Sequence, residues 1–382
     1  MAQDVVGSIP TSRPNSRPHS TGRQSPNPII YRASVTPRVP AIEALSAPAG
    51  LREWYVPFEP RRGLANGHLQ TIVGNYLPRP AFRLAGVAEE VEVDSADGSR
   101  VLCHCHWQPQ ADRASRLTIV LVHGLEGSSS SQYIQGIAMR AWTAGCNVIG
   151  MNMRNCGDTD ELSPTLYHSG LSGDVGAVVC HYAERFGLRR VALAGYSMGG
   201  NMVLKLAGEW GARPPLCAVA AVCPAIDLAA GSDALHEPLN RGYEWHFLRR
   251  LMRRFRRKAL HYPAIYEPSK IGRVRSLRDF DDKIVALYCD FRDADDYYYR
   301  ASAARVVDSI AVPTLILQAD DDPFIRLQAD TRAALHANPH VTLIETRHGG
   351  HCAYLSNDAG DDIHWAEATL VRYLLAVTAH AG

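Results

Sequence analysis

One serine in this chain stands where a serine can act as a nucleophile. Residues 195–199 read G-Y-S-M-G, directly after an apolar run that begins at residue 191, and a helical pattern follows. A strand–turn–helix of this kind places Ser197 on a sharp, strained turn, so the positions two before and two after it must lack a Cβ. Gly195 and Gly199 meet that demand. The pattern predicts an exposed, activated hydroxyl at the end of a strand.

An activated serine needs a general base and an acid that orients it. Two strand-like runs, 312–318 and 341–346, end in D-D-D-P at 320–323 and in H-G-G-H at 348–351. We predict His351 as the base, because the glycine pair lets the loop turn back over the sheet edge, and His348 as a structural donor. We predict Asp322 as the acid because Pro323 stiffens its turn, with Asp321 as the alternative.

A further carboxylate, Asp227, follows the strand-like run 217–223 and is a third candidate for the acid, although a helix-capping role is favoured for it. The order serine, aspartate, histidine along the chain is the order of α/β-hydrolases. It differs from the orders found in the other two Ser-His-Asp folds.

Negative charge on a reacting carbonyl oxygen needs preorganised N–H donors. The strand-like run 117–122 ends in H-G-L-E-G at 123–127, a turn of small residues that can point backbone N–H groups at that oxygen. We predict an oxyanion hole formed by the N–H groups of Leu125 and Met198.

The chain resembles the YheT-like α/β-hydrolases, prokaryotic hydrolases related to eukaryotic lipid-acting esterases and medium-chain acyl ester synthases. The resemblance runs from about residue 57 to the C-terminus. It is carried by N-G-H-L-Q-T-I at 66–72, H-G-L-E-G-S at 123–128, Y-H-S-G at 167–170, Asp174, G-Y-S-M-G-G-N at 195–201, D-Y-Y at 296–298 with A-S at 301–302, D-D-P-F at 321–324 and G-G-H at 349–351. It implies the triad Ser197, Asp322 and His351, in agreement with the strand ends. A local departure is R-N-C-G at 154–157, where many relatives have R-G-x-x-G.

Strand and helix patterns alternate from about residue 84, which predicts an α/β fold: a mostly parallel sheet with helices on both faces. The resemblance implies the α/β-hydrolase fold with eight strands. An antiparallel pair is expected at 87–93 and 100–108, joined by a turn at 95–98.

The regular alternation of strand and helix patterns stops after residue 227. We therefore expect a helical lid insertion at about 228–305 in a hydrolase domain that spans 51–382. Residues 1–50 are rich in Pro, Ser and Arg without apolar periodicity and are predicted to be a disordered tail.

Composition narrows the classes of partner and compartment. The net charge of +1 gives no indication of nucleic-acid binding, and no apolar stretch is long enough for a membrane span or a signal peptide. Nine cysteines without a C-x-x-C favour a reducing, cytoplasmic location. The run C-H-C-H at 103–106 alternates along a strand, so its cysteines and histidines point to opposite faces and cannot share a metal. Neither a metal nor a cofactor is expected.

The pattern of residues 243–261 predicts a helix within the insertion that has one apolar stripe and an otherwise basic surface. Its apolar stripe comprises Trp245, Leu248, Leu251, Met252, Phe255 and Ala259. Its remaining surface is basic, with Arg249, Arg250, Arg253, Arg254, Arg256, Arg257 and Lys258. We expect the stripe to pack on the body and the basic face to be solvated. The alternative is peripheral contact with an anionic membrane or a phosphate headgroup.

These patterns predict a serine esterase that acts on small-molecule or lipid esters of apolar, short- to medium-chain acyl groups through an acyl-enzyme. A serine at the turn, rather than an aspartate, argues against epoxide hydrolases and dehalogenases. The alternative is an acyltransferase or ester synthase that passes the acyl group to an alcohol. A non-catalytic binding module is disfavoured by the complete set of candidate residues. The tyrosines at 297–299 are candidates for an acyl pocket, although aromatic residues at a helix start are more often core. The sequence does not specify an oligomeric state.

Overall fold

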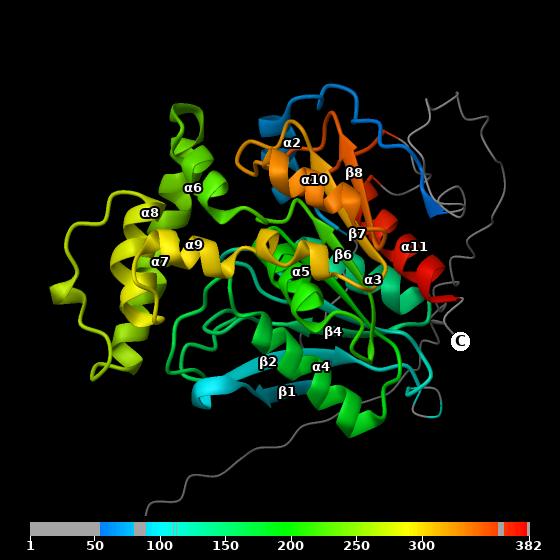
Figure 1. The fold of residues 1–382 in the computed structure, drawn as a ribbon, viewed down its shortest axis with the longest axis horizontal. Helices are drawn as coiled ribbons and strands as arrows, with labels where there is room; N and C mark the ends of the chain where they lie inside the picture. Colours follow the sequence, from blue (N-terminus) through cyan, green and yellow to red (C-terminus); the bar gives the residue numbers. More distant parts are fainter. Residues whose placement is uncertain (1–53, 80–88, 110, 112, 358–362, 380–382) are drawn as a thin grey trace, which may run out of the picture. The chain divides into compact units, whose positions relative to one another are not determined.

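A single eight-stranded sheet forms the centre of the fold (Figure 1). The computed structural model describes residues 54–79, 89–109, 111, 113–357 and 363–379, so the predicted N-terminal tail lies outside the described residues. The strands lie in the order β1-β2-β4-β3-β5-β6-β7-β8. Their bounds are β1 Glu89–Asp94, β2 Arg100–His106, β3 Thr118–Val122, β4 Asn147–Met151, β5 Val191–Tyr196, β6 Leu216–Val222, β7 Thr314–Ala319 and β8 Val341–Thr346.

Strand direction confirms the predicted fold class. β1 pairs antiparallel with β2, and β2 pairs antiparallel with β4, whereas all other neighbouring pairs are parallel. The turn between β1 and β2 includes Asp97 and Gly98, both with positive φ, as a tight reversal requires. The central strands β3, β4 and β5 are buried at every position, because helices cover both faces of a parallel sheet.

Successive residues of a strand point to opposite faces of the sheet and belong to two separate hydrophobic cores. On β3, Ile119 and Leu121 join one core with residues of α3 (Gln132–Thr143) and α11 (Trp365–Ala379). Val120 and Val122 join the other core with α4 (Ser172–Phe186) and α5 (Met198–Trp210). This alternation follows from the two-residue period of a strand. The other helices of the body, within the residues that the structure describes, are α2 (Gly67–Tyr76) and α10 (Ala329–Ala337).

A helical insertion separates β6 from β7. It contains α6 (Leu228–His236), α7 (Arg241–His261), α8 (Leu277–Phe280), the π-helix η5 (Asp281–Ala286) and α9 (Ala294–Ala301). Figure 1 shows α6 to α9 gathered at one end of the molecule. Short 3-10 helices are η1 Ala96–Gly98, η3 Pro238–Asn240, η4 Pro268–Lys270, η6 Ala303–Arg305 and η7 Val307–Ser309.

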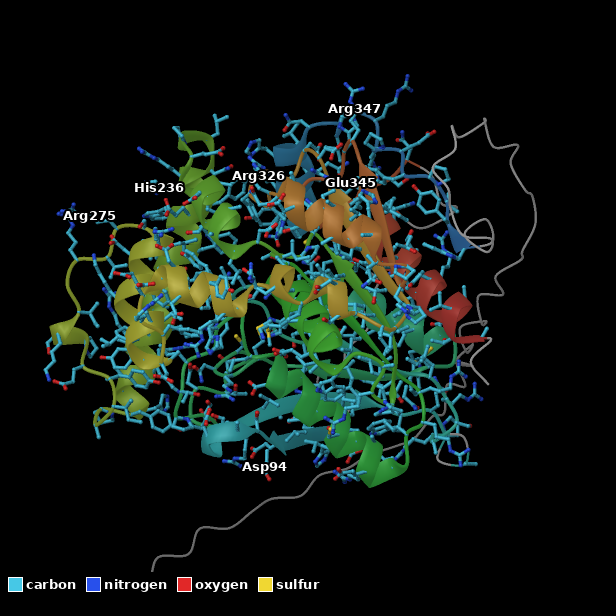
Figure 2. All side chains as sticks on the ribbon, viewed as in Figure 1. Asp94, His236, Arg275, Arg326, Glu345 and Arg347 are labelled. Carbon is cyan, nitrogen blue, oxygen red and sulfur yellow. The ribbon has the colours of Figure 1, made fainter. Side chains whose placement is uncertain are left out.

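Many charged side chains lie on the outside of the molecule, although several others are buried. Asp94, Arg275 and Arg347 are exposed and project away from the ribbon in Figure 2. Within the described ranges, no helix combines the length and the apolar character that a bilayer crossing requires.

Candidate functional site

Ser197 lies on the sharp turn between β5 and α5. Its backbone has φ 53° and ψ −117°, a conformation that is rare for a residue with a side chain. A Cβ added at Gly195 would lie 2.4 Å from the carbonyl oxygen of Gly199, and one added at Gly199 would lie 2.3 Å from that of His123. Both positions therefore need glycine, because a side chain there would collide with a neighbouring backbone carbonyl. The turn directs Ser197 into a cavity at the carboxyl edge of the sheet.

His351 is held by Asp322. Nδ1 of His351 lies 2.8 Å from Oδ2 of Asp322, and the other carboxylate oxygen accepts hydrogen bonds from the backbone N–H groups of Phe324 and Ile325. The Asp322 side chain is fully buried. The ring of Phe324 packs 4.2 Å from the imidazole, measured between centroids. These contacts fix the imidazole orientation and match the carboxylate–histidine arrangement of catalytic triads.

The other two carboxylate candidates have different partners. Asp321 lies 3.3 Å from Nδ1 of His348 and accepts a 2.8 Å hydrogen bond from Gly350 N, so it fastens the loop that carries the second histidine. Asp227 precedes α6, but its side chain does not cap that helix and instead accepts from Gln328 N. The capping role favoured from sequence is wrong, because the two carboxylate oxygens of Asp227 accept from Gln328 N and Thr331 Oγ1 at the start of α10.

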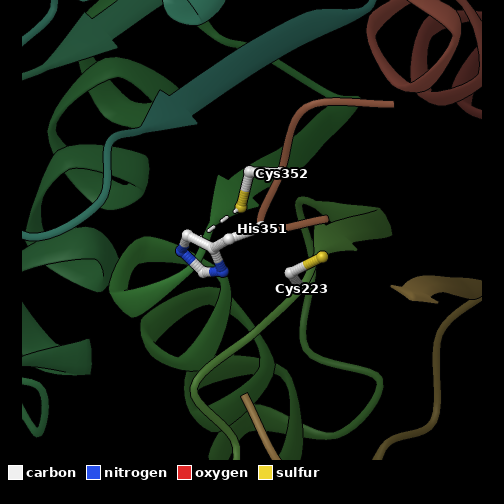
Figure 3. A group of neighbouring side chains, drawn as sticks. All are labelled: Cys223, His351 and Cys352. Carbon is white, nitrogen blue, oxygen red and sulfur yellow. Dashed lines mark hydrogen bonds between the residues drawn. The ribbon is translucent and has the colours of Figure 1, made fainter. Parts of the chain in front are cut away.

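Two cysteines stand beside the imidazole (Figure 3). Cys352 Sγ lies 3.7 Å from Nε2 of His351 and donates to the carbonyl oxygen of Val222 at 3.6 Å, the same oxygen that accepts from Ser197 N at 2.9 Å. Cys223 completes a group whose ligand atoms all lie within 4.8 Å of one another. In the described part of the chain, no hydrogen bond joins Ser197 Oγ to His351. Such bonds are often long in the absence of substrate.

The loop after β3 is held from two sides. His123 is buried, donates from Nδ1 to Gly124 O at 2.8 Å and accepts from Met153 N at Nε2. Burial lowers the pKa of His123 to about 4, so the imidazole is neutral at pH 7, as these two bonds require. The Gly124 N–H donates to the hydroxyl of Tyr133 at 2.8 Å. These bonds hold the loop that carries Leu125 in place.

Leu125 and Met198, the predicted oxyanion-hole residues, line the same cavity as Ser197. Met198 is the first residue of α5, so its N–H has no acceptor within the helix. Both residues therefore lie where their N–H groups can serve an oxygen bound beside Ser197, and the hole itself remains a prediction.

Sequence reasoning missed the supports of this site. His351 N donates to Thr71 Oγ1 of α2 at 2.8 Å, a contact between residues 280 positions apart. His68, also on α2, stacks on Tyr243 of α7 with ring centroids 5.8 Å apart. The motif at 66–72 was the available signal, since it carried the resemblance, but nothing local in it points to the histidine loop. Tyr133, which binds Gly124, had no signal of its own.

The cavity beside Ser197 has a volume of about 130 Å³ and is mainly apolar. Its apolar lining comprises Leu125, Met198, Ala225, Leu228, Leu235, Phe247, Leu251, Leu277, Phe280, Val285, Phe324 and Ile325. Tyr297 and Tyr298 also line it, whereas Tyr299 is exposed. Asp281 is the acidic exception: it lies 2.7 Å from the Tyr298 hydroxyl, and burial raises its pKa to about 7. Most of these walls come from the insertion, so the insertion shapes the space next to Ser197.

Helix α7 corrects two expectations. Leu251, Phe255 and Ala259 are buried as predicted, but Trp245 is 61% exposed, because near the start of α7 it shares the basic face and lies under Arg249. The basic face is not simply solvated either. Arg254 is 9% exposed and pairs with Glu126, and Lys258 is fully buried on the carbonyl oxygens of residues 160 and 163.

The C-H-C-H run on β2 uses its side chains separately. Cys105 Sγ lies 3.0 Å from the Tyr182 hydroxyl, and His104 Nδ1 lies 2.6 Å from Ser129 Oγ. In the turn at 154–157, which departs from the family pattern, Asn155 has φ 64°, a left-handed conformation that asparagine tolerates.

Comparison with known proteins identifies the family. The family model described as "Alpha/beta hydrolase family" matches residues 119–362. The chain is 32% identical to YheT of Escherichia coli (strain K12) over 320 residues, which cover 83% of this chain and 92% of YheT.

Two eukaryotic relatives carry names that state an activity. Phospholipase ABHD3 of Mus musculus is 28% identical over 70% of this chain and 66% of its own length. Medium-chain fatty acid ethyl ester synthase/esterase 2 of Saccharomyces cerevisiae is 26% identical over 67% of this chain and 61% of its own length. The chain belongs to the α/β-hydrolase family, as one of its YheT-like carboxylic ester hydrolases.

Proposed function

We propose that Ser197 is the nucleophile of this esterase, with His351 as its general base and Asp322 as the carboxylate that orients the base. The observation that carries the proposal is the 2.8 Å contact between His351 Nδ1 and a buried Asp322 oxygen, beside a serine held on a strained turn. When Nδ1 of His351 carries the proton and donates it to Asp322, Nε2 has no proton and can accept the one from Ser197 Oγ.

The chemistry follows from these positions. Ser197 Oγ attacks the ester carbonyl carbon, and the N–H groups of Leu125 and Met198 stabilise the oxyanion. His351 then gives its proton to the departing alcohol, which leaves an acyl-enzyme. A water molecule, deprotonated by His351, releases the acid and restores Ser197. No cofactor enters any of these steps.

The apolar cavity supports acyl groups of short to medium length, or those of lipids, as substrates. Its lining offers side chains such as Phe247 and Leu251 to an alkyl chain, and burial of apolar surface contributes roughly 0.8 kcal/mol per CH₂. A panel of p-nitrophenyl esters of increasing chain length measures this directly. We expect KM to fall with each added CH₂ until the cavity is filled.

A fluorophosphonate probe tests the nucleophile. The probe should label the wild-type chain stoichiometrically, and Ser197→Ala should abolish both labelling and turnover. The control is Ser232→Ala, which removes another hydroxyl from the same cavity and should keep the label. Labelling that survives in Ser197→Ala, or residual turnover of a few per cent, would contradict the assignment, since loss of a triad member costs roughly a millionfold.

Acyl transfer is the second candidate, because one relative is named as an ester synthase as well as an esterase. Both reactions share the acyl-enzyme and differ in whether water or an alcohol attacks it. Turnover of p-nitrophenyl octanoate in the presence of ethanol separates them. Ethyl octanoate as the main product would indicate a transferase, and octanoate would indicate a hydrolase.

A further inference from the structure

A second cavity, of about 560 Å³, opens on the basic side of α7. We call it the arginine hollow. It is lined by Glu126, Gly127, Ser128, Gly157, Asp158, Trp245, His246, Arg249, Arg250, Arg253, Arg254 and Arg257. Five guanidinium groups thus face two carboxylates, so the hollow carries a clear excess of positive charge.

Part of that charge is neutralised by neighbours. Arg254 is paired with Glu126, and Arg257 lies 2.9 Å from Asp160. Arg249 and Arg253 differ: both are exposed, and among the described residues neither has an acidic partner. These two side chains keep their hydrogen-bond donors available for a ligand.

The hollow adjoins the catalytic cavity. Phe247 and Leu251 of α7 line the apolar cavity beside Ser197, whereas the arginines on the neighbouring face of the same helix line the hollow. The loop after β3 is shared in the same way, with Leu125 in the first cavity and Glu126 in the second. One helix and one loop therefore separate the place for the acyl chain from a cationic site.

We propose that the arginine hollow binds an anionic group, a phosphate or a carboxylate, carried on the alcohol side of the ester substrate. The proposal rests on the proposed function of Ser197. A guanidinium offers a planar pair of donors that matches the oxygens of either anion. With the acyl chain in the apolar cavity and the carbonyl at Ser197, the alcohol side extends past Leu125 and Glu126 toward the hollow.

The shape of the site favours a substrate group over a lipid surface. The cationic side chains surround a concavity, and Arg250 is tied to the Glu126 carbonyl oxygen at its wall. A helix that lies on a membrane instead inserts an apolar face between its basic residues. On α7 the apolar residues Leu251 and Phe255 are buried in the protein, and the exposed Trp245 lines the hollow under Arg249. The exposed Leu260 lies in the last turn of the helix, outside the hollow.

A matched pair of soluble substrates tests the proposal: mono-octanoylglycerol and mono-octanoylglycerol phosphate, both below their micelle concentrations. We expect the full chain to prefer the phosphate ester, with the preference in KM rather than in kcat. The double variant Arg249→Gln/Arg253→Gln should lower the ratio of the two kcat/KM values by at least about ten-fold, because hydrogen bonds to a charged group are lost. Arg256→Gln, an exposed arginine of α7 outside the hollow, should keep the ratio.

Further arms separate the possible failures. Calorimetric titration with glycerol phosphate should show binding to the wild-type chain and none to the double variant, even when neither ester is hydrolysed. Hydrolysis without binding or preference would overturn the proposal while leaving the role of Ser197 intact. A salt-sensitive gain that appears only for mono-octanoylglycerol on phosphatidylglycerol vesicles would overturn it in favour of a membrane surface. An unchanged ratio in the double variant would do so as well.

Discussion

Arg254 of α7 forms a two-point ion pair with Glu126 of the loop after β3. Nε of Arg254 lies 2.7 Å from Oε1 of Glu126, Nη2 lies 3.2 Å from Oε2, and both side chains are buried. The hydroxyl of Tyr167 donates to the same carboxylate at 2.7 Å. Burial alone would raise the pKa of Glu126, but the hydrogen bond and charge of Arg254 outweigh it and lower that pKa. The pair couples the insertion to the residue next to Leu125.

Breaking this pair should damage both stability and turnover. In Arg254→Met the buried Glu126 carboxylate keeps Arg250 at 3.5 Å and the Tyr167 hydroxyl but loses its two-point partner, so we expect the free energy of unfolding to fall by roughly 3 kcal/mol, the low end of the cost of breaking a buried pair. Esterase kcat should fall as well, because the loop that carries Leu125 loses its anchor. Urea denaturation and ester turnover measure the two effects.

The double variant Arg254→Met/Glu126→Gln provides the matched test. Removing both charges should recover part of the lost stability, since no unpaired charge then remains buried. Arg256→Met, on the exposed face of the same helix, is the control and should stay close to wild type. Equal losses in the single and double variants would show that the pair contributes little.

Replacing each of the three candidate carboxylates by its amide should lower kcat by different amounts. In Asp322→Asn, the amide oxygen can keep the bonds from Phe324 N and Ile325 N, and the NH₂ group then faces His351 Nδ1 and enforces the wrong tautomer. We expect kcat to fall by about four orders of magnitude. Asp321→Asn and Asp227→Asn should cost far less, because those side chains bond elsewhere. A larger loss in Asp321→Asn, with folding intact by circular dichroism, would transfer the acid role to Asp321.

Local pattern accounted for the sheet and for the order of the candidate residues. β8 has the predicted bounds 341–346, and β3 and β7 begin and end within two residues of the expected positions. β3 and β7 are buried runs of mostly apolar residues, and β8 is a half-buried edge strand rich in β-branched residues. Both signals are local and need no distant partner. Asp322 and His351 were found in the same way, as polar residues directly after such strands.

Contacts across long sequence distances were beyond that reasoning. Lys258 was assigned to a solvated face because helical periodicity describes one helix, whereas its burial depends on carbonyl oxygens more than 90 residues away. Trp245 was assigned to the packed stripe for the same reason. Thr71 supports His351 through one hydrogen bond, and no spacing rule connects positions so far apart.

Asp281 should make acyl binding depend on pH. Burial raises its folded pKa to about 7 from the ordinary aspartate value of 3.8, so the folded state holds a proton that the unfolded state loses between these values. Stability from the neutral carboxyl therefore falls as pH rises from about 4 through about 7. Above that range a charge stands in the apolar cavity, so KM for a medium-chain ester should rise.

Asp281→Asn should remove both effects, because an amide does not titrate and can still accept from Tyr298. We expect the difference between its free energy of unfolding and that of the wild type to rise in favour of the variant from about pH 5 to about pH 8.5, measured by urea denaturation. Its KM should stay level over the same range. Asp308→Asn, at an exposed position, is the control. A wild-type pH profile that persists in Asp281→Asn would assign the titration to another group.

Soft divalent metals should inhibit the enzyme through the group in Figure 3. Cys223, His351 and Cys352 place two sulfurs and one nitrogen within 4.8 Å of one another, a donor set suited to Zn²⁺ or Cd²⁺. A metal there would occupy His351, the proposed base, so ester turnover should stop and return on addition of EDTA. Burial raises the pKa of Cys352, and the metal must displace the thiol proton. Inhibition should therefore strengthen as pH rises.

Ligand removal decides whether that group is responsible. Cys223→Ser and Cys352→Ala should each raise the inhibition constant for Cd²⁺ by at least about ten-fold, since each removes a thiolate ligand. Cys217→Ser is the matched control, because Cys217 lies on β6, the strand that Cys223 directly follows, and outside the group. Inhibition of equal strength in all three variants would place the metal elsewhere, and inhibition that weakens with rising pH would contradict a thiolate ligand. Cys223→Ser and Cys352→Ala thus test whether the two cysteines lie close to His351, whatever the natural substrate is.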